Sequence, residues 1–217
     1  NSLIIFDRFS LQNANAVIFA TSGAGKSYAV KLEIVRSMMM GVEVIVIDPE
    51  MEYKQLSDAV GGTYIGISLA SKAKINPFDL PRPTGEAYQT DDIIRSAVIT
   101  IKGLLRLMLG SVTPMEDSLL DRALLETYAK KDITSTSNLA EVEPPTLGDF
   151  EDILEGMEGT AELVIKLRKY TEGTFAGLLN SPTTVQVNNQ LVVFSVRDLE
   201  DELRPLAIYT IINYIWN

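Results

Sequence analysis

The chain has 217 residues, of which 46% are hydrophobic and 22% are charged. This is the composition of a globular protein that can bury a substantial core, not of a disordered chain. Asp and Glu number 29 against 19 Lys and Arg, a net charge of −10, which excludes a wholly basic nucleic-acid-binding surface but leaves room for a local basic channel. Cysteine and histidine are absent. Any chemistry must therefore use carboxylates, Lys, Arg, hydroxyls, backbone amides or a hard cation bound through oxygen.

Strand and helix patterns alternate in the first eighty residues. Residues 16–20 form a short apolar run of the buried-strand type, and residues 27–40 have the apolar spacing of a helix. The β-branched run 42–47 predicts a second strand, and residues 63–68, after a Gly-Gly turn, predict a third. This alternation predicts a βαβ unit and a mostly parallel sheet covered on both faces.

The middle of the sequence changes to helical patterns. Residues 91–109 have helical spacing, and Thr113-Pro114-Met115-Glu116 is a capping box that opens a helix to about Lys130. A second cap at Thr146 predicts a short helix, and residues 161–170 predict another. Between residues 86 and 170 there are 16 acidic and 9 basic residues, so this region carries −7 of the total charge.

The end of the sequence returns to the α/β pattern. Residues 191–196 predict a strand, and Pro205 is well placed as the first residue of a helix. We therefore expect an α/β core from residues 1–80 and 186–217, interrupted by a mainly helical insert, 81–185. No apolar run reaches the roughly 20 residues that span a bilayer. Because the sequence lacks an initiating Met and stops inside an apolar run, we expect an internal piece of a longer protein.

The segment with the strongest chemical content is Ala20-Thr21-Ser22-Gly23-Ala24-Gly25-Lys26-Ser27. It departs from the P-loop pattern G-x-x-x-x-G-K-[ST] only where Ala20 replaces the first Gly. The two glycines allow backbone N–H groups to surround phosphate oxygens, and the following helix N-terminus adds free amides. Lys26 would reach the β- and γ-phosphates, and Ser27 would ligate Mg²⁺. The sequence thus predicts ATP or ADP binding by residues Thr21 to Tyr28; a glycine-rich turn with a solvated Lys is the alternative.

Hydrolysis also requires carboxylates that hold the Mg²⁺ shell and orient the attacking water. Asp48 and Glu50 follow an apolar strand, where strand ends line ligand crevices in open α/β sheets. They are the candidate catalytic carboxylates beside Lys26; a turn before Pro49 is the alternative. Asp198 follows the later strand, and we favour a helix cap there.

Several segments occur in an order and at spacings that resemble one known family. They are Phe6-Asp7-Arg8-Phe9, the phosphate loop, Ile47-Asp48-Pro49-Glu50-Met51-Glu52-Tyr53, Ile75-Asn76-Pro77-Phe78 and Phe194-Ser195-Val196-Arg197-Asp198-Leu199. Together they resemble the C-terminal ATPase domain of the VirB-four class, the conjugal-transfer ATPases of type IV secretion systems. That class belongs to the FtsK/HerA branch of P-loop NTPases. The resemblance implies a RecA-like core with an inserted all-helical subdomain.

The resemblance also implies function. Members of this class work at the cytoplasmic face of the inner membrane, energise secretion-channel or pilus assembly and substrate transfer, and form hexamers or dimers. Their partners include other type IV secretion components and a DNA or protein substrate. The family's Walker B carboxylates would follow the helix that begins near Pro205, beyond Asn217, so this piece is expected to bind ATP yet hydrolyse little. By that argument neither Asp48 nor Asp198 is Walker B.

Two alternatives remain open. One is a DNA-translocating or coupling ATPase of the same branch, which the acidic insert disfavours, and the other is a nucleotide-regulated binding module without turnover. Two further groups of residues are weaker candidates for nucleotide contacts. Tyr53, Tyr64 and Phe78 could stack on adenine although core positions are the more usual role for such aromatics, and Arg8, Arg82 and Arg197 could contact phosphate.

Overall fold

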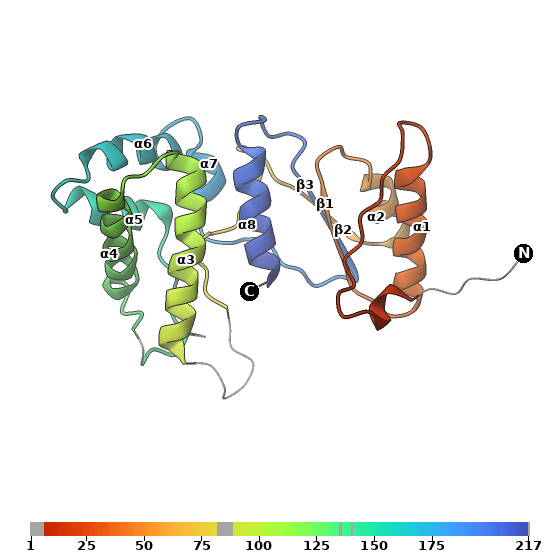
Figure 1. The fold of residues 1–217 in the computed structure, drawn as a ribbon, viewed down its shortest axis with the longest axis horizontal. Helices are drawn as coiled ribbons and strands as arrows, with labels where there is room; N and C mark the ends of the chain where they lie inside the picture. The colour runs from red at the N-terminus through yellow and green to blue at the C-terminus, as the bar shows by residue number, and fades with distance from the viewer. Residues whose placement is uncertain (1–6, 82–88, 135, 140, 217) are drawn as a thin grey trace, which may run out of the picture. The chain divides into compact units, whose positions relative to one another are not determined.

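The computed structural model describes residues 7–81, 89–134, 136–139 and 141–216. It shows a mixed α/β protein with a small parallel sheet and a helical region (Figure 1). The chain divides into two compact units, Asn1–Val44 and Ile45–Asn217. The predicted division into a core and an insert, at residues 80 and 186, remains a prediction.

The first unit contains a short 3-10 helix, η1 (Arg8–Ser10), and the helix α1 (Lys26–Met39). The predicted helix over 27–40 is therefore confirmed, one residue earlier at each end. The strand predicted over 16–20 is wrong, because residues 11–25 contain no helix or strand and the Phe19 side chain is 90% exposed. An apolar run forms a strand only where a neighbouring strand supplies ladder hydrogen bonds, and the described sheet is built from other segments.

The sheet has three described strands, β1 (Val44–Asp48), β2 (Thr63–Gly66) and β3 (Leu191–Ser195), in the order β1-β3-β2. Strands β2 and β3 run parallel, with Thr63 opposite Val192. Every residue of β3 is buried. A central strand with both faces covered requires such a continuous apolar run, so the sequence pattern and the position in the sheet agree.

The carboxyl ends of all three strands lie at one edge of the sheet. The Val196 N–H donates to the Asp48 carbonyl at 3.3 Å, and the Ile67 N–H donates to the Ser195 carbonyl at 2.8 Å. The segment after β1 leads into α2 (Lys54–Val60), which ends at Gly61 in the left-handed conformation, φ 71°. This edge therefore gathers the segments that follow each strand.

Among the described residues, the helical region has five helices before β3 and a further helix after it. They are α3 (Thr90–Leu109), α4 (Pro114–Lys130), α5 (Leu147–Glu155), α6 (Ala161–Thr171), α7 (Ala176–Leu179) and α8 (Arg204–Trp216). The predicted starts and ends agree with these bounds to within one residue for α3 and α6, and α8 begins one residue before the predicted start at Pro205. One hydrophobic core joins residues of these helices to β2 and β3, so the region is not packed independently of the sheet.

The helix caps predicted at Thr113 and Thr146 are present. At α4 the Glu116 N–H donates to the Thr113 hydroxyl, while the Thr113 N–H donates to the Glu116 carboxylate at 2.8 Å. At α5 Thr146 and Asp149 make the same reciprocal pair. Burial opposes ionisation of Asp149, but hydrogen bonds from Thr146 and the nearby Lys131 outweigh it and lower the pKa of that carboxyl. These caps form from local sequence alone.

The Ile75-Asn76-Pro77-Phe78 segment ties the helical region to the sheet. The buried Asn76 side chain donates to the Pro145 carbonyl at 2.8 Å and accepts from the Phe78 N–H at 3.1 Å. Phe78 has no exposed surface, and its ring packs against Tyr128 and Phe150. The suggestion that Phe78 stacks on adenine is therefore wrong, because its ring is enclosed by core side chains.

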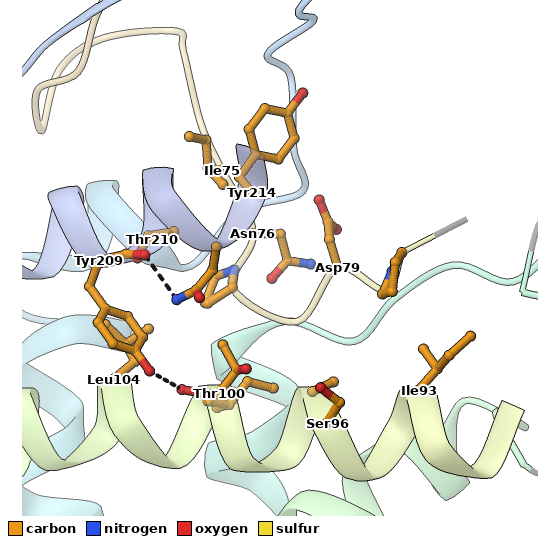
Figure 2. A pocket seen from close by; sticks show the side chains of 15 residues that line it. Ile75, Asn76, Asp79, Ile93, Ser96, Thr100, Leu104, Tyr209, Thr210 and Tyr214 are labelled. Atoms are coloured by element: carbon orange, nitrogen blue, oxygen red, sulfur yellow. Dashed lines mark hydrogen bonds between the residues drawn. The ribbon is translucent and has the colours of Figure 1, made fainter. Parts of the chain in front are cut away.

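Helix α8 packs beside α3 and leaves a small crevice between them (Figure 2). The Tyr209 hydroxyl donates to the Thr100 carbonyl at 2.9 Å, and the Asn213 amide donates to the Tyr209 carbonyl at 2.9 Å. Gly103 makes this packing possible, since a Cβ there would collide with the Tyr209 hydroxyl. The crevice has about 50 Å³, enough for one or a few waters and far below the hundreds of Å³ that a nucleotide needs.

Candidate functional site

The phosphate loop lies in the first unit, directly before α1. Gly23 and Gly25 have φ of 78° and 88°, the left-handed conformation that glycine adopts without steric cost. The Ala24 N–H donates to the Thr21 carbonyl at 3.1 Å, which closes a turn within the loop. Space beside both glycines is open, with no described atom within 4 Å of where a Cβ would stand. The glycines are therefore required by backbone conformation and not by crowding.

The side chains predicted to act on the nucleotide stand where the loop becomes helix. Lys26 is the first residue of α1 and is exposed, and Ser27 follows it in the first turn. Gly25 is the N-cap and has no side chain, so no side chain of the cap residue occupies the first amides of α1. The helix dipole and a Lys at one helix start are a favourable environment for an anion such as phosphate. Tyr28, also predicted to bind nucleotide, is exposed on the same turn.

Ala20 has an ordinary backbone conformation. It is absent from the described non-glycine residues with positive φ, which are Met51 and Asp132. The Cβ that distinguishes Ala20 from the usual Gly is therefore accommodated without backbone strain at that position.

In the second unit, Asp48 organises the loop that follows β1. Its side chain is buried, and its two carboxylate oxygens accept three backbone hydrogen bonds. Oδ1 accepts from the N–H groups of Glu50 at 3.3 Å and Glu52 at 3.1 Å, and Oδ2 accepts from the N–H of Tyr53 at 2.9 Å. The carboxylate thus holds the following five residues in one conformation.

Two further features define this loop, which we call the Asp48 loop, residues 48–53. Met51 has φ of 62°, a conformation that costs a non-glycine residue roughly 1–2 kcal/mol. Arg197, which follows β3, donates from Nη1 to the Glu50 carbonyl at 3.1 Å. The strained residue persists because hydrogen bonds on both sides of it fix the backbone, a pattern that recurs at functional sites.

The side chain of Glu50 is exposed and makes no hydrogen bond or ion pair within the described part of the chain. Tyr53, at the end of the same loop, is half-buried; burial raises the pKa of its phenol, and the Glu52 and Asp48 carboxylates raise it further. Glu50 is therefore the carboxylate that the loop leaves available, whereas Asp48 is occupied by backbone amides.

The remaining predicted residues have separate places. Asp198 does not cap α8, because that helix begins at Arg204 and the Arg204 N–H instead donates to the Glu200 carbonyl at 3.2 Å. Arg8 pairs with Glu33 at 2.6 Å within the first unit, and Arg82 lies outside the described residues. Tyr64 is half-buried, with Lys54 Nζ 5.8 Å from its ring centre.

Mg²⁺ would have few protein ligands here. No group of three or more Asp or Glu among the described residues is arranged to hold a metal ion. A nucleotide-bound Mg²⁺ usually takes one or two protein oxygens together with phosphate oxygens and water. The Ser27 hydroxyl remains the oxygen predicted for this role.

Comparison with known proteins places these features in a family. The family described as "Helicase HerA, central domain" matches residues 13–147, which include both the phosphate loop and the Asp48 loop. The chain belongs to this family. No curated protein matches the sequence.

A solved structure narrows the comparison. The structure of VirB4 of Thermoanaerobacter pseudethanolicus matches with a TM-score of 0.85 and 29% sequence identity. The match covers 100% of this chain and 60% of that chain. The resemblance to the VirB-four class that the motifs indicated is thereby confirmed, and the chain is a HerA-family domain with a VirB4-like structure. No helix in the described ranges is long and apolar enough to cross a membrane.

Proposed function

We propose that this chain is the ATP-binding and ATP-hydrolysing motor domain of a protein that energises type IV secretion or conjugal transfer. The observation that carries the proposal is the phosphate loop: two left-handed glycines and an exposed Lys26 at the start of α1, in a chain with the VirB4 fold. Such a protein would act at the cytoplasmic face of the inner membrane, as a hexamer or dimer, with other secretion components and a DNA or protein substrate.

In this proposal the amides of residues 21–28 and the Lys26 ammonium hold the phosphates. The Ser27 hydroxyl contributes one oxygen to Mg²⁺, which when bound neutralises charge on the transferred phosphoryl group. Phosphoryl transfer depends mainly on positioning and electrostatic stabilisation, so these contacts bind the nucleotide and orient it.

We further propose different roles for the two carboxylates of the Asp48 loop. Glu50 has the available side chain and is the candidate for orienting the attacking water. Asp48 acts as a positioning residue, because three backbone amides already occupy its oxygens. In the protein that contains this chain, Glu50→Gln should leave ATP binding normal but slow phosphate release at least tenfold; an unchanged rate would remove Glu50 from the chemistry.

The binding proposal is tested by calorimetric titration of the chain with ATP and with ADP, each with and without Mg²⁺. Wild-type protein should bind both, and Mg²⁺ should tighten ATP binding. In Ser27→Ala the Mg²⁺-dependent gain should shrink while metal-free affinity changes little. Absence of any ATP binding by the folded chain would contradict the proposal.

The DNA-translocating alternative is tested separately. A DNA pump should show DNA affinity that falls steeply with salt, because binding releases counterions from phosphates. The acidic composition of the chain disfavours this, with a net charge of −10. Binding without turnover in the protein that contains this chain would instead favour the nucleotide-regulated binding module.

A further inference from the structure

We propose that the helical region carries a docking groove for a cationic, amphipathic segment of a partner protein. The groove lies between α4 and the turn that follows α5, two elements grouped in the helical region of Figure 1. Its volume is about 490 Å³. It lies wholly in the second unit and does not involve the phosphate loop or the Asp48 loop, so it does not depend on the proposed ATPase function.

The floor of the groove is apolar. Leu119 of α4 faces Ile153 and Met157, which are half-buried and pack against the hydrophobic core. Met115 lies beside this floor, since both Leu119 and Met115 are close to Gly159: a Cβ there would stand 3.7 Å from Leu119 Cδ1 and 3.9 Å from Met115 Cε. Met115 is 71% exposed. Flexible methionine side chains adapt well to apolar partner side chains.

The wall formed by the turn after α5 is held in place before any partner binds. The buried Thr160 hydroxyl lies 2.5 Å from the Leu154 carbonyl oxygen and 2.7 Å from the Met157 carbonyl oxygen. Its single proton can be donated to either of them. Gly156 lines the groove without a side chain that would fill it. A preformed groove lowers the entropic cost of binding.

The charge around the groove selects the class of partner. Residues 141–162, which form α5 and its flanks, contain eight Asp and Glu and no Lys or Arg. On the groove itself stand Glu126, Asp152 and Glu158, with Arg122 as the one cation among the lining residues. Glu126 is already paired with Arg122 at 2.8 Å and Asp152 with Lys130 at 3.7 Å, so Glu158 is the rim carboxylate that a partner's cation can reach. Glu158 has no ion pair within the described ranges. An acidic rim repels nucleic acid and anionic lipid, and it is complementary to Lys and Arg beside an apolar anchor.

An apolar floor flanked by charge is the arrangement that receives amphipathic helices, whose anchors recur at positions i, i+3, i+4 and i+7. The partner segment should therefore be a basic helix with one apolar face. Met115 and Met157 should contact its anchors, and Glu158 should contact its cations.

The probe is a synthetic 14-residue peptide of Leu and Lys, with the Leu residues at helical spacing. There are two control peptides. The first has the same composition, but its Leu residues are spaced so that no apolar face forms, and the second has Glu in place of every Lys. Binding to the 217-residue chain is followed by fluorescence anisotropy and by the methyl signals of ¹³C-methionine-labelled protein. The amphipathic Lys peptide should shift the Met115 and Met157 signals and leave Met108, which is buried in α3, unshifted; both control peptides should bind at least tenfold more weakly.

Two matched pairs of variants separate the groove from general acidity. Met115→Ala is paired with Ile165→Ala, an apolar residue of α6 with similar exposure (69%). Glu158→Lys is paired with Glu162→Lys, which makes the same charge change on an exposed residue of α6 that does not line the groove. We expect Met115→Ala and Glu158→Lys each to weaken peptide binding about tenfold, as loss of one well-buried contact would, and each control to change it less than twofold.

Several outcomes would overturn the proposal. Equal losses in the members of a pair would show that binding follows net charge or general hydrophobicity. Equal affinity for the peptide without an apolar face would show the same. Shifts of the Met115 and Met157 signals with protein concentration alone would identify a second copy of the chain as the occupant instead.

Discussion

The phosphate loop and the Asp48 loop differ in what holds them. The phosphate loop contains a turn hydrogen bond from the Ala24 N–H to the Thr21 carbonyl and takes its shape from two glycines that adopt left-handed conformations freely. The Asp48 loop contains a strained Met51 and is held by three hydrogen bonds to Asp48 and one from Arg197. A loop that is to wrap a ligand can take its shape from glycine conformations, whereas a loop that presents a carboxylate must be fixed by side chains, here those of Asp48 and Arg197. Substitutions in the phosphate loop should therefore change mainly ATP affinity, and substitutions in the Asp48 loop should change mainly the free energy of unfolding.

The largest effect should follow Asp48→Ala. The change leaves three backbone N–H groups without their acceptor. Hydrogen bonds to charged groups contribute a net of about 1.5–3 kcal/mol each, and water that reaches the freed amides recovers part of the sum. We expect the free energy of unfolding in urea to fall by about 3 kcal/mol. Asp58→Ala, on the exposed side of α2, is the control and should change it by less than about 0.5 kcal/mol. A loss below about 1 kcal/mol for Asp48→Ala would mean that other contacts hold the loop.

Lys26→Ala should affect ligand binding and not stability. Lys26 is exposed at the start of α1, so its removal costs the fold little. Loss of one charge-assisted contact to the β- and γ-phosphates should weaken ATP binding by roughly 10- to 100-fold. Calorimetry measures the affinity, thermal unfolding verifies the fold, and Lys31→Ala on the same helix is the matched control. Unchanged ATP affinity in a folded Lys26→Ala protein would move the nucleotide site elsewhere.

Substitutions at Met51 should separate strain from packing in the Asp48 loop. Met51→Gly removes the steric cost of φ at 62° but gives the unfolded chain more freedom, so stability should change little. Met51→Val puts a β-branched side chain into the same conformation and should destabilise the protein by about 1–2 kcal/mol. Urea unfolding of both variants measures the difference. Equal stability of the Val and Gly variants would show that the loop relaxes readily and is not rigidly held.

The sequence predicted best what depends on neighbouring residues. The caps at Thr113 and Thr146 and the helix after the phosphate loop follow from local hydrogen bonds and apolar spacing, and all three are present. The strand over 16–20 was predicted wrongly, because strand formation requires a partner that lies elsewhere in the sequence. The same holds for Asn76, whose partner at Pro145 is far away in sequence, and for Arg197, which reaches the Glu50 carbonyl from the other end of the chain.

The candidate site also combines features that neighbouring residues determine with features that depend on more distant contacts. The Gly-x-Gly-Lys-Ser run predicts phosphate binding from sequence because each residue acts through its own backbone or side chain. The sequence identified the Asp48 loop as a strand end with carboxylates. It did not indicate that the Glu50 side chain is available while that of Asp48 is occupied by backbone amides. Nothing in Asp-Pro-Glu-Met-Glu-Tyr signals a left-handed residue at Met51, where Gly or Asn would be usual. That conformation is imposed by the hydrogen bonds to Asp48.

The smallest effect should follow Ala20→Gly, which restores the usual P-loop residue. If the phosphate loop takes its shape from Gly23 and Gly25, the Cβ of Ala20 does not affect the loop conformation. Its removal should then leave ATP affinity within about twofold of wild type. The added glycine increases the freedom of the unfolded chain, so stability should fall by about 0.4–1 kcal/mol. Calorimetry and urea unfolding on the same preparation measure both quantities, and Ala24→Gly, inside the turn, is the comparison. A more than tenfold tightening of ATP binding in Ala20→Gly would show that Ala20 strains the phosphate loop, and that this loop, like the Asp48 loop, is held away from its relaxed conformation.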